Sequence, residues 1–305
     1  FIGGQAGTSL IDGDHNIAVG KAALFSDTKG SRSTAVGHGV FSTQNFSTSV
    51  NSYNTGLGYK AGEATTTGIQ NTLIGALAGD DLTDADSNTT LGYATLSADT
   101  LGSRSTAIGT FALNEQNFTT ATNTYNTAIG YAAGGAITTG TQNTLIGGLA
   151  GDALQDADQN VAIGASSLTT DTLGTGAVAI GYAALNEQNF TSATTNYNVA
   201  VGYKAGESVS TGIQNTFVGG LAGDATDDGN YNVAVGLQAL SANCGDRNTA
   251  VGESALSLTT VDNNTGIGNG AGKTLSTGTQ NTFVGSAAEM LLTMVAIMLL
   301  RVMQL

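Results

Sequence analysis

Residues 126–134 read NTAIGYAAG, and near copies recur along the chain, among them NTLIGGLAGD at 143–152, NVAIGASSL at 160–168 and NVAVGYKAG at 198–206. Their shared part is a pentad of the form Asn-Thr-Ala-Ile-Gly. Sixteen complete pentads follow one another, most of them at a 17-residue spacing, and a truncated copy ends at Gly3. Self-similarity at such a short fixed period is typical of a solenoid, in which each repeat forms one coil.

A longer period lies on top of the short one. The spacing lengthens to a 21-residue gap after Gly37, Gly109 and Gly181, and these three glycines recur with a 72-residue period. Four coils therefore make one super-repeat, with an insertion at the same place in each.

Each column of the pentad indicates a physical role. The residue before the terminal Gly is Ile, Val or Leu, and the residue two places earlier is Thr, Val or Ile, which is the period-two pattern of a short strand. The residue between them is Ala in most copies and never charged, so both faces of the strand are apolar, as in strands that are covered on both sides. We expect one face to line the coil interior and the other to contact a second copy of the chain.

From this pattern we assign the fourth pentad residue, the aliphatic column before Gly, to the core. We assign the third pentad residue, which is most often Ala, to the face that contacts a partner. The predicted core residues are Val19, Ile74, Ile108, Ile129, Ile146, Ile163, Ile180, Val201 and Val218. The predicted oligomer face consists of Ala107, Ala128, Leu145, Ala179 and Phe217.

The first and last residues of the pentad are predicted to turn the chain. Asn begins 13 of the 16 complete copies, tolerates left-handed backbone and could form a ladder of amides between coils. Gly ends every copy and permits positive φ or close approach of the neighbouring backbone. A small residue three places later, such as Ala133 or Ala150, fits a tight corner.

The predicted fold class is all-β: a parallel β-solenoid of about 17 coils with a 17-residue repeat and a 72-residue super-repeat. At ~4.8 Å per coil the stack would span ~77 Å. The solenoid should cover residues 1–288, and because the chain begins inside a pentad we expect it to be a segment of a longer polypeptide. Residues 289–305 contain all four Met and no Gly, and we expect a short apolar helix there, below the ~20 residues that cross a bilayer.

Composition excludes several classes of protein. The 305 residues include 44 Gly, no Pro and no Trp, and the absence of Pro excludes collagen. The formal net charge of −14 opposes nucleic-acid binding. A lone Cys cannot form an internal disulfide, and two His cannot by themselves form a zinc site, so no cofactor is expected.

The quoted repeats resemble the head repeats of trimeric autotransporter adhesins and repeats common in bacteriophage tail-fibre and structural proteins. The resemblance covers residues 1–288 and implies a left-handed β-roll in which three chains stand side by side, as an adhesive or receptor-reaching shaft. Longer coils and the 72-residue super-repeat depart from the adhesin heads, and no coiled-coil stalk or membrane anchor is recognisable. We therefore expect a homotrimeric, extracellular phage tail fibre, with a bacterial surface adhesin or self-assembling filament as the alternative.

The three long connections are candidate glycan contacts, because aromatic rings stand there among amide and hydroxyl groups, a mixture that suits carbohydrate. The competing interpretation, which we favour, is that these rings fold back to cover the edge of the roll. The residues are Phe46, Tyr53, Phe118, Tyr125, Phe190 and Tyr197.

Acidic turns are weak candidates for calcium, which takes oxygen ligands. Their spacing matches neither an EF-hand nor the Gly-Gly-x-Gly-x-Asp calcium roll, and a solvated turn is the better interpretation. The carboxylates concerned are Asp80, Asp84, Asp86, Asp152, Asp156 and Asp158, with Asp224, Asp227 and Asp228 in the third super-repeat.

No set of nucleophile, base and acid stands out, so an enzyme is not expected; GIGNGAGKT at 266–274 lacks the spacing of a phosphate loop. Ice binding through the Thr column is also disfavoured, since that column shares parity with the aliphatic column and is expected to point inward.

Overall fold

Every complete pentad forms a three-residue β-strand at its second to fourth residues, as in Thr127–Ile129 and Thr144–Ile146. The computed structural model describes residues 1–288, so the helix expected at 289–305 lies outside the described residues. The chain divides into two units, Phe1–Asn160 and Val161–Leu305, which are described separately.

In each unit eight pentad strands form a parallel sheet in sequence order, with equivalent pentad positions side by side; Ala128, for example, pairs with Leu145. In the first unit the strands are β1 (Ile17–Val19), β3 (Thr34–Val36), β5 (Thr55–Leu57), β6 (Thr72–Ile74), β7 (Thr89–Leu91), β9 (Thr106–Ile108), β11 (Thr127–Ile129) and β12 (Thr144–Ile146). In the second they are β13 (Val161–Ile163), β15 (Val178–Ile180), β17 (Val199–Val201), β18 (Thr216–Val218), β19 (Val233–Val235), β20 (Thr249–Val251), β21 (Thr265–Ile267) and β22 (Thr282–Val284).

The described residues thus form an all-β parallel solenoid of about 16 coils, which confirms the predicted fold class. The truncated first pentad adds only an isolated bridge between Ile2 and Val19.

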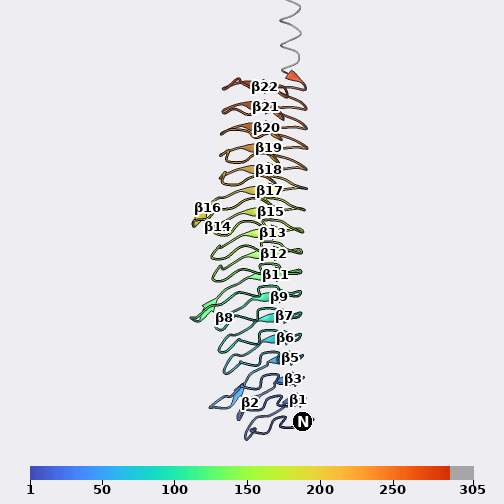
Figure 1. The fold of residues 1–305 in the computed structure, drawn as a ribbon, viewed down its shortest axis with the longest axis vertical. Helices are drawn as coiled ribbons and strands as arrows, with labels where there is room; N and C mark the ends of the chain where they lie inside the picture. The colour runs from blue at the N-terminus through green and yellow to red at the C-terminus, as the bar shows by residue number, and fades with distance from the viewer. Residues whose placement is uncertain (289–305) are drawn as a thin grey trace, which may run out of the picture. The chain divides into compact units, whose positions relative to one another are not determined.

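The 21-residue coils carry extra two-stranded ladders, which Figure 1 shows beside the main stack of each unit. They pair β2 (Gly30–Ser31) with β4 (Val50–Asn51), β8 (Gly102–Ser103) with β10 (Thr122–Asn123), and β14 (Gly174–Thr175) with β16 (Thr194–Thr195). The inserted residues therefore project sideways, and the main sheets keep their register.

The pentad Gly allows the coils to approach each other closely. Gly219 has φ +137°, and a Cβ added there would lie 2.5 Å from the carbonyl oxygen of Gly236 in the next coil. A side chain at this position would push the coils apart, which confirms the close backbone approach predicted for this column.

The Asn column links successive coils mainly through the backbone, and amide-to-amide hydrogen bonds of the predicted kind occur between Asn143 and Asn126 (3.3 Å) and between Asn281 and Asn264 (3.0 Å). The backbone N–H of Asn71 donates to Oδ1 of Asn54 (2.9 Å), and Nδ2 of Asn71 donates to the carbonyl oxygen of Ala85 (2.7 Å). The left-handed residue is the one before the Asn, such as Gln70 with φ 60°. Each buried Asn thereby satisfies polar backbone groups at the corners of two coils.

The assignment of the two strand faces was wrong. The residues predicted to contact a partner, Ala107, Ala128, Leu145, Ala179 and Phe217, are fully buried inside the coils. The residues predicted as core, Val19, Ile74, Ile108, Ile129, Ile146, Ile163, Ile180, Val201 and Val218, lie on the outer face and are half-buried or exposed. Alternation fixes only that the columns lie on opposite faces; the narrow interior selects the column of smaller side chains.

The super-repeat also appears in the side chains that fill this interior. Where the middle strand residue is Phe217, a Cβ added at Gly206 or Gly223 would lie 2.9 or 2.5 Å from its ring. Where it is Ala234, the corner residue equivalent to Gly223 is Leu240, and both are buried. A large side chain therefore stands either at the middle strand position or at the corner position, since the interior of a coil has room for one but not for both.

This exchange predicts a compensating pair of substitutions. Phe217→Ala should lower the free energy of unfolding by about 3–5 kcal/mol because it leaves a cavity. Phe217→Ala with Gly223→Leu should recover most of that loss by recreating the Ala234 and Leu240 arrangement, as measured by urea unfolding. Gly223→Leu alone should destabilise the protein. If Gly223→Leu is neutral, or if the effects of the two substitutions on the free energy of unfolding simply add, the proposed compensation between the two positions is refuted.

Candidate interaction surfaces

The outer face of each main sheet is free of charge. It consists of two columns, one of Thr, Val or Ile and one of Ile, Val or Leu. The second column is aliphatic in every pentad strand, and several of its members, including Leu57, Leu91 and Ile267, are more than 40% exposed. Regular exposed aliphatic surface of this kind is uncommon on soluble proteins.

The Thr side chains belong to this outer face, which corrects a second expectation. Thr127 and Thr144 flank the buried Ala128 and Leu145 and are half-buried on the side opposite to them. The parity argument against an ice-binding face is therefore wrong, because Thr and the aliphatic column share a face that points outward.

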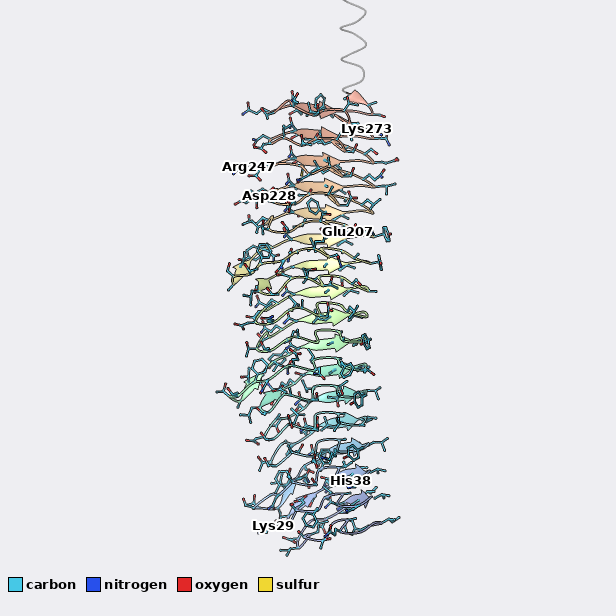
Figure 2. All side chains as sticks on the ribbon, in the orientation of Figure 1. Lys29, His38, Glu207, Asp228, Arg247 and Lys273 are labelled. Atoms are coloured by element: carbon cyan, nitrogen blue, oxygen red, sulfur yellow. The ribbon has the colours of Figure 1, made fainter. Side chains whose placement is uncertain are left out.

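Charged side chains stand away from the sheet face, at the edges of the coils. In Figure 2 the labelled Lys29 lies at one edge of the first unit, and in the second unit Asp228 and Arg247 lie opposite Glu207 and Lys273. The sheet face itself therefore carries no charge.

Aromatic rings form short stacks at the corner that follows the strands. His38 stacks on Tyr59 with ring centroids 5.4 Å apart, and Tyr182 stacks on Tyr203 at 5.6 Å. The tyrosines are about half exposed. Lys60 and Lys204 form ion pairs with Glu63 and Glu207 beside these stacks.

The candidate glycan-contact residues of the long loops fall into two groups, buried phenylalanines and exposed tyrosines. Phe46, Phe118 and Phe190 are buried, at 4%, 7% and 6% exposure, so they cover the edge of the coil and cannot contact a ligand. Tyr53, Tyr125 and Tyr197 are 51%, 51% and 62% exposed. The competing interpretation thus holds for the phenylalanines, and the tyrosines remain available.

A buried polar network supports each loop. Oδ1 of Asp99 accepts hydrogen bonds from the backbone N–H groups of Gly102 and Phe118 (both 3.0 Å), and Oδ2 accepts one from Nε2 of Gln116 (2.6 Å). Oε1 of Gln116 accepts from Nδ2 of Asn126 (2.8 Å), which ties the loop to the Asn column. Burial raises the pKa of Asp99 despite these bonds.

The network recurs at the other two 21-residue coils, where Gln44 and Gln188 bind Asp27 and Asp171 of the preceding coil. Sequence reasoning missed it. The available signal was Asp-Thr-x-Gly, which occurs once in each super-repeat, at 27–30, 99–102 and 171–174.

The acidic turns use their carboxylates within the protein. Asp84 and Asp156 accept hydrogen bonds from the Thr67 and Thr139 hydroxyls (2.6 and 2.9 Å). Asp86 and Asp158 accept from backbone N–H groups of the preceding coil. Within residues 1–288 no group of three or more His, Cys, Asp or Glu is arranged to hold a metal ion.

Asp80, Asp152 and Asp224, at equivalent places in the three super-repeats, differ from the other turn carboxylates. Oδ1 of each is buried without a hydrogen-bond partner among the described residues. Desolvation raises the pKa of all three, that of Asp80 to about 6.

Cys244 is also buried, and desolvation raises the pKa of its thiol to about 11, so it is poorly reactive.

In the part of the chain that the structure describes, no helix is long and apolar enough to span a membrane. Comparison with known protein families, characterised proteins and solved structures finds no match to this chain.

The raised carboxyl pKa values predict an unusual pH dependence. Because the pKa of Asp80 is higher in the folded than in the unfolded chain, the folded state binds more protons between those two values. Stability should therefore rise as the pH falls from 7.5 to 5, as measured by thermal unfolding. Asp80→Asn, Asp152→Asn and Asp224→Asn together should raise stability at pH 7.5 and reduce the dependence; a melting temperature that falls on acidification would refute this.

Proposed function

We propose that the chain is a structural subunit of a rigid extracellular fibre, and that it associates with copies of itself through the outer face of its sheets. The charge-free Thr and aliphatic columns carry this proposal. In a separate chain they would leave an unbroken aliphatic column in water, which favours aggregation. Burying that column against another subunit removes it from solvent.

A second copy fits this face better than an unrelated partner. The net charge of −14 makes two copies repel each other, and all Lys, Arg, Asp and Glu lie outside the pentads. The sheet face is where copies can approach without that repulsion. A copy also has the same spacing between coils, so its columns interdigitate in register along the whole contact.

Three copies are proposed, on the resemblance of the repeat to trimeric fibres. With three chains around one axis each sheet face meets the other two, and the loops and aromatic stacks stay at the periphery. The loops would then be free for receptor contact.

A phage tail fibre involved in host attachment is the function that we favour, and a bacterial surface adhesin or filament is the alternative. The two share one architecture, and immuno-negative staining of the native particle distinguishes them. Catalysis is not part of the proposal, since β-solenoids are mostly structural and the buried carboxylates Asp99 and Asp171 already bind protein donors. Release of reducing ends from host polysaccharide would contradict this.

Matched Thr→Lys pairs test the association. Thr127→Lys with Thr144→Lys places charge on the sheet face, where an unpaired buried charge costs several kcal/mol. Thr119→Lys with Thr120→Lys adds the same charge to an exposed loop. Light scattering should show single chains for the first pair and the parental trimer for the second.

Equal masses for both pairs, or a single chain for the parental protein, would contradict the proposal. Circular dichroism of each variant separates loss of assembly from loss of folding.

Ice binding is a second candidate because the Thr columns point outward. The first unit carries Thr in seven of the eight strands at the pentad's second place, with Ile17 in the other. Thermal hysteresis by the parental protein, lost in Thr127→Lys with Thr144→Lys, would favour this function. The wholly aliphatic neighbouring column favours protein contact, so we expect no hysteresis.

A further inference from the structure

Two of the 21-residue loops pair an exposed tyrosine with an arginine from the preceding coil. The Cζ atom of Arg32 lies 5.9 Å from the ring centroid of Tyr53, and that of Arg104 lies 5.7 Å from the ring centroid of Tyr125. Arg247 makes a similar contact with Tyr231 at 5.3 Å. All three arginines of residues 1–288 therefore lie beside an exposed tyrosine.

The first two pairs also have an asparagine at the same place in the loop. Nε of Arg32 donates to Oδ1 of Asn51 (2.9 Å). In the second loop Asn123 is the equivalent residue, and Nη1 of Arg104 donates to the Tyr125 hydroxyl (2.9 Å). Each loop thus combines a guanidinium, a phenol ring and an amide on one surface.

The backbone holds these groups in place. Arg32 and Arg104 have left-handed φ values of 64° and 66°, and Tyr53 and Tyr125 share φ 52°. The N–H groups of Arg32 and Arg104 donate to the carbonyl oxygens of Asp14 and Asp86 in the coil before (both 2.9 Å). Ordered positions of this kind reduce the entropy lost on binding.

Within residues 1–288 neither guanidinium has a carboxylate partner, although acidic residues outnumber basic ones by 23 to 9 in the sequence. The ion pairs in this part of the chain are Lys60 with Glu63 and Lys204 with Glu207. Guanidinium binds carboxylate and phosphate oxygens through paired N–H donors. The remaining N–H donors of Arg32 and Arg104 are therefore available to an anion from outside.

We propose that the loops with Arg32, Asn51 and Tyr53 and with Arg104, Asn123 and Tyr125 each bind an acidic sugar residue of a surface glycan. The guanidinium holds its carboxylate or phosphate, the tyrosine ring packs on the sugar ring, and the asparagine amide binds a hydroxyl group. The inference deepens the host-attachment part of the proposed function and does not depend on the number of subunits.

The third loop provides an internal control. Gly176 and Thr195 stand where the other loops have Arg and Asn, while Tyr197 is retained and exposed. A Cβ added at Gly176 would lie 3.6 Å from Cδ1 of Tyr197, an ordinary contact, so a side chain fits there. The φ of Gly176, +80°, is close to the left-handed values of Arg32 and Arg104.

Calorimetry on the full chain tests the proposal with three probes: an oligogalacturonate, the same oligosaccharide with its carboxyl groups reduced, and glucose 6-phosphate. We expect binding of an anionic probe that weakens with salt, and little binding of the neutral one. Binding of the first or third probe identifies carboxylate or phosphate as the recognised group.

Variants assign the binding to the loops. Arg32→Gln with Arg104→Gln should weaken binding of the anionic probe by about tenfold or more, the effect of losing hydrogen bonds to a charged group. Gly176→Arg with Thr195→Asn should raise the number of sites per chain. Arg247→Gln, outside the two loops, is the matched control and should leave both affinity and stoichiometry unchanged.

Equal binding of the neutral oligosaccharide, no binding of either anionic probe, or binding unaffected by Arg32→Gln with Arg104→Gln would overturn the inference. Light scattering on the same samples separates the two proposals: an intact trimer that binds no anionic probe refutes glycan recognition alone.

Discussion

The structure depends on the in-register stacking of one coil on the next. A backbone carbonyl lies where a side chain at the pentad Gly would be, as Gly219 and Gly236 show, so coils stack closely only where this column is Gly. The Asn column then carries hydrogen bonds from coil to coil, as between Asn54 and Asn71. Together these two columns place every equivalent residue of the repeat above its predecessor.

Stacking at this spacing leaves a narrow interior. The volume of that interior determines which strand residues point inward and which corner residues are glycine. The interior accepts Ala128 from the strand and sends Ile129 and Thr127 outward. Where a larger residue such as Phe217 enters, the corner residues beside it are Gly206 and Gly223, where any side chain would meet its ring. The side chains excluded from the interior form the uncharged face through which we propose that copies associate.

The repeat itself predicted the strands, their parallel order, the Gly contact and the linkage through Asn, because each depends on the local sequence of one pentad. The assignment of the strand faces failed because alternation shows only that two columns lie on opposite faces, not which face is interior. The smaller volume of Ala128 compared with Ile129 would have identified the interior column. Burial of Phe46, Phe118 and Phe190 depends on the path of the long loops, which composition does not specify. The network of Asp99 and Gln116 joins residues of adjacent coils, so it is visible only once the coils are stacked.

The central claim, that Thr127 faces a neighbouring copy and not the interior, is tested most directly by electron paramagnetic resonance. A nitroxide is attached at Thr127→Cys in a Cys244→Ser background, with Thr119→Cys as the loop control. The account predicts dipolar coupling between labels at position 127, weakened when labelled chains are mixed with unlabelled ones, and much weaker coupling at position 119. Absence of coupling at position 127 in an assembled sample, or coupling unaffected by that mixing, would contradict it.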